Sequence, residues 1–101
     1  MNKAEDVATV VAVTIPIFGQ LACTLFDSGA THSFVSFRFA RKISSMPVKL
    51  ELEFYVATLS GEVLNCKEVL KGCAMTIANR ELGADLVIMY MYDFDVILVM
   101  D

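Results

Sequence analysis

The sequence predicts a single, mainly β domain with a closed, barrel-like or sandwich-like core and one short helix. β-branched residues dominate residues 7–15, and such side chains favour strands. Residues 50–57 alternate apolar and polar side chains with the period of two that is typical of a half-buried strand. Two short apolar runs, residues 86–89 and 96–99, are typical of strands buried on both faces. With 101 residues, 56% of them hydrophobic, the chain can form one core.

The first predicted element after the N-terminus is a β-hairpin. Its first strand ends in a turn over residues 16–20, in which Gly19 is expected to take a positive φ. Residues 21–26 form the returning strand, so the hairpin places Asp27 at its far end. Extended structure is expected to resume over residues 31–35.

The one helix is predicted over residues 36–43. Ser36 is expected to cap its N-terminus, because a serine hydroxyl accepts a hydrogen bond from the amides of the first turn. The cations Arg41 and Lys42 would lie in its last turn, where they oppose the helix dipole favourably. Pro47 is expected to end this segment.

The second half of the chain is predicted to be β-structure throughout. The predicted strands are residues 48–57, 62–70, 73–78, 86–89 and 96–99. Turn or loop residues separate them at Ser60–Gly61, Lys71–Gly72, residues 79–84 and residues 90–95.

Charge and cysteine content argue against several classes of function. The formal net charge is -4 and the basic residues are scattered, so nucleic acid is not expected as a partner. Cys23, Cys66 and Cys73 include no C-x-x-C pair, and the chain has one histidine. Neither a zinc site nor a disulfide framework fits this pattern. We therefore expect no metal and no cofactor, and interpret the cysteines as small buried hydrophobes.

The N-terminal residues do not resemble a secretory signal. Residues 1–6 form a polar tail with Glu5 and Asp6 where a signal would carry basic residues. The apolar stretch over residues 7–18 is too short to span a bilayer. We expect an intracellular, cytoplasmic domain over residues 7–101 that does not contact a membrane, either free-standing or released from a longer polypeptide.

Asp27 is the candidate chemical group of the chain. It follows an apolar strand and is followed at once by Ser28, Gly29 and Ala30. The acid is either an ordinary turn residue or a carboxylate held for chemistry, because Asp-Ser-Gly is compatible with both. In the second case the amides of Gly29 and Ala30 can point toward the carboxylate and favour its ionised form.

One carboxylate alone does not make an acid–base catalyst. Two carboxylates that share one proton do, because close like charges separate the two pKa values. The chain has a single Asp-Ser-Gly, so the second carboxylate would come from another copy. The simplest arrangement is a homodimer with twofold symmetry that brings both Asp27 side chains to the axis.

These residues resemble a known family. Residues 25–36, Leu-Phe-Asp-Ser-Gly-Ala-Thr-His-Ser-Phe-Val-Ser, closely resemble the active-site stretch of retropepsin-like aspartic proteases of gypsy-type long-terminal-repeat retrotransposons in plants. The tail over residues 93–101 resembles the closing motif of that family, and residues 60–64, with Cys66 and Cys73, match its middle.

The resemblance implies a retropepsin-like fold, a homodimer and the cleavage of polyprotein substrates in an extended conformation. It assigns Asp27 as the catalytic acid, with Ser28, Gly29 and Ala30 completing the active-site motif. It also implies a flap, a cover over the substrate, in the hairpin that contains the following residues: Thr58, Leu59, Ser60, Gly61 and Glu62.

Two departures from the family pattern favour an alternative. Val99 stands where the family has glycine, and we expect its side chain to crowd the active-site turn. The chain ends at Asp101, where relatives continue, so a weaker dimer is expected. The alternative is a catalytically weakened or inactive domain that serves as a dimerisation or interaction module. A small ligand-binding β-barrel without a paired carboxylate is a third hypothesis.

Three other constellations have simpler interpretations. His32 lies too close in sequence to Ser28 and Ser33 to suggest a nucleophile–base pair, and is interpreted as a structural polar residue. The remaining acids near the C-terminus match no cation-binding loop and are interpreted as loop or helix-start residues: Asp93, Asp95 and Asp101. Nearby large apolar residues are assigned to the core or an interface: Met89, Tyr90, Met91 and Met100.

Overall fold

Seven strands and one short helix form the part of the chain that this computed structural model describes, residues 10–57, 61–77 and 79–99. In chain order they are β1 (Val10–Ile17), β2 (Gln20–Asp27), β3 (Phe34–Ser36), α1 (Phe37–Ala40), β4 (Val48–Ala57), β5 (Val63–Ile77), β6 (Arg80–Met89) and β7 (Val96–Val99). The predicted mainly β class with one short helix is confirmed. The predicted tail, residues 1–6, and Thr58, Leu59 and Ser60 of the predicted flap lie outside the described residues.

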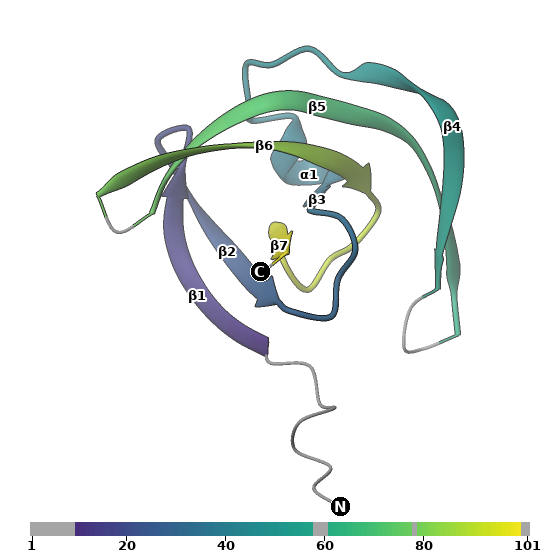
Figure 1. Cartoon of the computed structure of the whole chain (residues 1–101), viewed down its shortest axis with the longest axis horizontal. Coiled ribbons are helices and arrows are strands. Elements are labelled where there is room, and N and C mark those ends of the chain that lie inside the picture. The colour runs from purple at the N-terminus through teal and green to yellow at the C-terminus, as the bar shows by residue number, and fades with distance from the viewer. Residues whose placement is uncertain (1–9, 58–60, 78, 100–101) are drawn as a thin grey trace, which may run out of the picture.

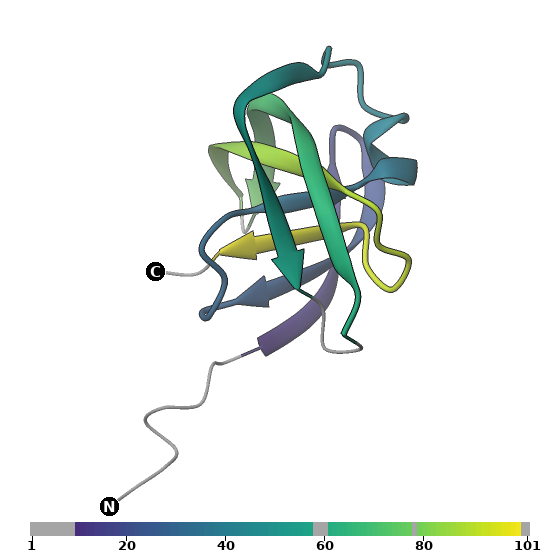
Figure 2. The ribbon, with the colours of Figure 1, turned by 90° about the vertical axis from the view of Figure 1, so that its right-hand side faces the viewer.

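The strands form one strongly curved sheet in the order β1-β2-β7-β3-β6-β5-β4. A pairing between Ile17 of β1 and Met75 of β5 brings the two sides of the sheet together, so six strands nearly close and β4 lies outside the ring. Figure 1 shows β5 and β6 arching over the shorter β3 and β7. In Figure 2, β2 (blue) and β7 (yellow) run in the same direction, in keeping with their parallel pairing.

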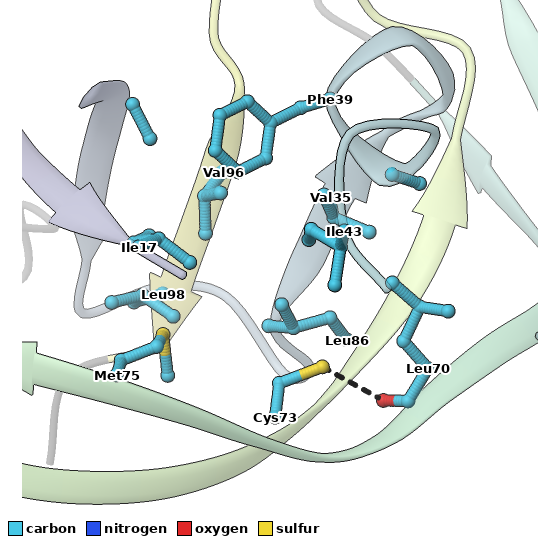
Figure 3. Close-up of a cluster of buried hydrophobic side chains, with 12 residues drawn as sticks. Ile17, Val35, Phe39, Ile43, Leu70, Cys73, Met75, Leu86, Val96 and Leu98 are labelled. Carbon is cyan, nitrogen blue, oxygen red and sulfur yellow. Dashed lines mark hydrogen bonds between the residues drawn. The ribbon is translucent and has the colours of Figure 1, made fainter. Parts of the chain in front are cut away.

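The core inside this sheet has two parts. The larger cluster lies between α1, β5, β6 and β7, and Phe39 of α1 packs into it (Figure 3). Within it the Sγ–H of Cys73 donates to the carbonyl of Leu70 over 3.7 Å. The smaller cluster contains Cys66, Phe34, Val69, Val87 and Met89. The interpretation of the cysteines as buried hydrophobes is confirmed for Cys66 and Cys73, whose side chains are fully buried, and is wrong for Cys23, which is half-buried.

The β1–β2 hairpin closes as predicted, with one unforeseen feature. Gly19 has a φ of 74°, and Phe18 before it has a φ of 53°. Two consecutive positive φ angles in a two-residue loop are typical of the tight turn that matches the twist of paired strands. The register that follows from this turn places Val10 opposite Asp27.

The turn predicted at Lys71–Gly72 is wrong. β5 continues through it, and the pairing of β5 with β6 shifts register between Leu70 and Cys73. Gly72 takes a φ of 63°, and its N–H donates to Oδ1 of Asp85 on β6 over 2.9 Å. Glycine therefore marks a bulge that bends a long strand.

The loop predicted over residues 79–84 is also wrong. Only Asn79, with a φ of 64°, shows turn geometry there, and β6 begins at Arg80. Residues 80–83 are all exposed, including the large apolar Leu82 at 44%, so both faces of β6 are exposed at this end. The strand was missed because a strand exposed on both faces carries no period-two hydrophobic pattern.

The helix and the strand after it differ in detail from prediction. Ser36 is the N-cap, as expected, and its Oγ accepts a hydrogen bond from the N–H of Phe39 over 3.0 Å. The helix ends earlier than predicted, so Arg41 is its C-cap residue instead of lying in its last turn. In β4 the predicted alternation of apolar and polar residues does not give a fully buried face, because Leu52 is 84% exposed on this outer strand.

No helix among the described residues is long and apolar enough to cross a membrane.

Candidate active site

Asp27 is the last residue of β2 and lies between two neighbouring strands. Val10 of β1 pairs with it on one side and Val99 of β7 on the other. The Oδ1 atom of Asp27 accepts a hydrogen bond from the N–H of Gly29 over 2.9 Å. The N–H of Ala30 donates to the backbone carbonyl of Asp27 over 3.3 Å, so the prediction that it points to the carboxylate is wrong. The turn therefore fixes the carboxylate with one amide.

A second set of contacts fixes the loop after this turn. Ser33 Oγ accepts a hydrogen bond from the N–H of Val99 over 3.2 Å, which joins the loop to β7. The carbonyl of Ser33 accepts another from the N–H of Val87 on β6 over 2.9 Å. Ser33 therefore joins the loop that follows the Asp27 turn to both β7 and β6. Sequence reasoning missed this role, because the three residues are far apart in the chain.

Asp95 connects β2, β3 and β7 at the start of β7, whose other end pairs with Asp27. Its Oδ2 accepts a hydrogen bond from the N–H of Cys23, and its own N–H donates to the carbonyl of Cys23, both over 2.8 Å. The N–H of Ser36 donates to the carbonyl of Asp95 over 2.8 Å. Asp95 immediately precedes β7, so these bonds set the position at which β7 enters between β2 and β3. The interpretation as a loop residue is confirmed, while its contact with β2 was not foreseen.

The Asp27 carboxylate opens on a cleft of about 710 Å³. Gly29 and Ala30 of the predicted motif line the cleft with it, whereas Ser28 is exposed in the same turn and is not part of the lining. The apolar lining comes from four strands: Phe34, Leu52, Val56, Met89 and Ile97. β4 supplies one wall of the cleft, with Leu52, Glu53, Tyr55, Val56 and Ala57.

The cleft also has polar side chains at its rim. His32 Nδ1 forms a hydrogen bond with Thr31 Oγ1 over 3.0 Å, and its ring meets Phe34 edge to face at 6.3 Å between centroids. Glu53 Oε1 accepts a hydrogen bond from Nδ2 of Asn65 on β5 over 3.2 Å. Sequence reasoning interpreted His32 as structural and did not single out Glu53, because the bend of the sheet alone brings β4 to this cleft.

Two residues of the predicted flap are described, Gly61 and Glu62. Both are exposed just before β5, and Gly61 has a φ of 92°. Neither residue is part of the described cleft lining. The lining residues of β4 lie earlier in the chain, between Leu52 and Ala57. The flap assignment stays a prediction.

The described side chains offer little other reactive chemistry. Burial raises the pKa of the Cys66 thiol, and burial together with the nearby Asp85 raises the pKa of the Cys73 thiol. Both thiols therefore stay protonated and weakly nucleophilic at neutral pH. Over residues 10–57, 61–77 and 79–99, no cluster of three or more His, Cys, Asp or Glu side chains could hold a metal ion.

Comparisons with known proteins agree with this geometry. The structure is similar to the crystal structure of the retroviral protease-like domain of Ddi1 from Leishmania major, with a TM-score of 0.66 and 18% identity over 92% of this chain and 74% of that one. At this identity the likeness shows the fold, which is retropepsin-like. No curated protein matched the sequence significantly. The model of the family described as retroviral aspartyl protease matches residues 1–101. The chain therefore belongs to the retroviral aspartyl protease family.

Proposed function

We propose that the chain is an aspartic endopeptidase domain that hydrolyses peptide bonds with two Asp27 carboxylates, one from each protomer of a homodimer. One observation carries this proposal: Asp27 ends β2 in a turn bonded to the Gly29 amide and faces a cleft with apolar walls. A carboxylate in this setting has a fixed orientation and a neighbouring space for a peptide.

The chemistry follows from the pairing of the two carboxylates. Close together they cannot both ionise, so one is charged and the other holds a proton. The charged Asp27 removes a proton from a water molecule, whose oxygen attacks the peptide carbonyl carbon. The protonated Asp27 donates its proton to the carbonyl oxygen. The Asp27 that took the proton from water then gives it to the amide nitrogen, while the other Asp27 takes a proton from a hydroxyl of the tetrahedral intermediate. The C–N bond breaks, an amine and a carboxylic acid leave, and the pair again shares one proton.

Exposed apolar residues beside Asp27 support a homodimer. Val11 and Val13 on β1 are 44% and 38% exposed, and Val99 on β7 is 39% exposed. β1 and β7 flank β2. Val99 pairs with Asp27 and projects from the same face of the sheet, whereas Val11 and Val13 project from the opposite face. A twofold interface that covers Val99 would also bring the second carboxylate to the axis.

The proposed substrate is a polypeptide in an extended conformation. The cleft is bounded on one side by β4, the outer strand of the sheet, and extended peptides bind readily beside a strand edge. The resemblance of residues 25–36 to gypsy-type retrotransposon proteases of plants favours an intracellular polyprotein as this substrate. Under this proposal the hairpin at Gly61 and Glu62 acts as the flap.

The position of Val99 favours a second candidate function. Its Cα pairs with that of Asp27 on the adjacent parallel strand, so both side chains project from the same face of the sheet. A branched side chain there occupies space beside the carboxylate. The alternative function is a weakened or inactive domain that dimerises without cleaving peptides.

A cleavage assay at mildly acidic pH separates the two candidates. Purified wild type and Asp27→Asn are compared on a mixture of unstructured polypeptides, with sedimentation to establish the dimer. An endopeptidase gives cleavage by wild type and none by Asp27→Asn. Dimers that cleave nothing support the interaction module, and cleavage by both proteins rules out the role of Asp27.

A further inference from the structure

The cleft beside Asp27 has an uneven distribution of charge. Four titratable side chains line it among the described residues: Asp27, His32, Glu53 and Tyr55. No lysine or arginine contributes to the described lining. Two acidic side chains and no basic lysine or arginine make the described lining acidic, which favours cationic ligands.

Glu53 is held in place on the β4 wall of the cleft. Its Oε1 accepts one hydrogen bond, from Nδ2 of Asn65 on the neighbouring β5 strand. An ionised carboxylate has about four acceptor positions, so most of its capacity is left for a ligand. The pairing of β4 with β5 shifts register between Lys49 and Phe54, which displaces the segment that carries Glu53 from the regular ladder.

Apolar side chains line the same cleft as this carboxylate. Leu52 and Val56 line the cleft from β4, while Met89 and Ile97 line it from β6 and β7. A ligand that fits has an apolar part for these side chains and a cationic group for Glu53. Lysine and arginine side chains combine a long aliphatic stem with a charged end.

We propose that Glu53 is a specificity-determining residue, which makes the cleft prefer peptides with a lysine or arginine next to a large apolar residue. This inference rests on one part of the proposed function, namely that the cleft binds peptides. In a twofold dimer each protomer contributes its own Glu53, so the preference applies on both sides of the cleaved bond.

Binding to a protein that cannot cleave tests this inference. The Asp27→Asn protein keeps an acceptor oxygen for the Gly29 amide and removes the other carboxylate from the cleft. The probes are fluorescein-labelled alanine decapeptides with Phe-Leu at the centre and one Lys, Gln or Glu placed at each other position in turn. Fluorescence anisotropy at about pH 7 gives a Kd for each peptide.

We expect lysine at one or two positions to lower Kd about fivefold relative to glutamine, the effect of a favourable exposed ion pair. Glutamate at the same positions should raise Kd. The difference should shrink as salt rises from about 0.05 M to about 0.5 M, because ions screen exposed charges. Adding Glu53→Gln should abolish the preference, while the control Glu51→Gln, on the same strand but outside the cleft lining, should keep it.

Three results would overturn the inference: no peptide binds, no position prefers lysine, or the preference survives Glu53→Gln in a protein with an unchanged circular dichroism spectrum. Hydrolysis by the wild-type protein is measured separately on the same peptides. A lysine preference without hydrolysis contradicts the proposed function alone. Hydrolysis that depends on Asp27 but ignores lysine contradicts this inference alone.

Discussion

Replacing Asp95 tests whether the contact between β2 and β7 stabilises the frame of the site. In Asp95→Ala the N–H of Cys23 loses its carboxylate acceptor, which lies 2.8 Å away in the wild type. A hydrogen bond to a charged group contributes about 1.5–3 kcal/mol, so we expect a loss of about 2 kcal/mol in the free energy of unfolding. The backbone bonds of Asp95 with Cys23 and Ser36 need no side chain and should remain.

Asp95→Asn shows how much of the loss in the free energy of unfolding comes from the charge of the acceptor and how much from the hydrogen bond itself. Its amide oxygen still accepts from Cys23 as a neutral group, so we expect about half the loss seen with alanine. Urea unfolding at fixed protein concentration measures both changes, with the midpoint of Asp95→Ala lower by about 1–2 M and the slope unchanged. Asp93→Ala, at an exposed loop position, is the control and should leave the midpoint in place. An Asp95→Ala midpoint equal to that of wild type would refute the reasoning.

Four further predictions have defined outcomes. Ser36→Ala removes the acceptor for the buried Phe39 amide at the start of α1 and should lower the free energy of unfolding by about 1 kcal/mol in urea titrations; no change would contradict the cap. Cys66 and Cys73 should react with a thiol reagent at neutral pH only on unfolding, and later than the half-buried Cys23. The folded state keeps these two protons longer than the unfolded state, so stability should fall as pH rises above about 9, whereas a rise would reverse the sign. Val99→Gly should increase peptide cleavage by freeing space beside the carboxylate, and equal or lower activity would contradict crowding.

Local signals in the sequence were sufficient for much of the fold. The hairpin that ends at Asp27 has a tight turn at Gly19 between two apolar strands, and hydrogen bonds close in sequence determine it. The cap of α1 is equally local, because Ser36 and the amide that it accepts from are three residues apart. Such patterns depend on the chain nearby and on little else.

The errors have a common physical origin in long-range pairing. Gly72 has the composition of a turn, yet β5 pairs with β6 both before it, at Leu70, and after it, at Cys73, so the strand continues through a bulge. β6 was predicted to start later because the first residues of that strand are exposed on both faces. Strand pairing supplied the stabilisation that the local sequence did not indicate.

The candidate site was predictable only in its central part. Asp27 and its turn carry a motif, so the sequence alone located them. Ser33, Asp95 and Glu53 carry none, since each acts on a partner that the sheet topology brings close. Sheet topology, and not composition, places Glu53 in the cleft lining and makes Ser33 and Asp95 supports of the strands around it.

Mixing wild-type protein with Asp27→Asn tests the paired carboxylates most directly. With the amount of wild type held constant, an equal amount of the variant should leave about half of the wild-type chains in fully wild-type dimers. If each active site needs Asp27 from both protomers, peptide cleavage should fall to about half with equal amounts and to about one tenth with a ninefold excess. Cleavage that stays constant at every ratio, with exchange of protomers shown by sedimentation of tagged chains, would contradict the account.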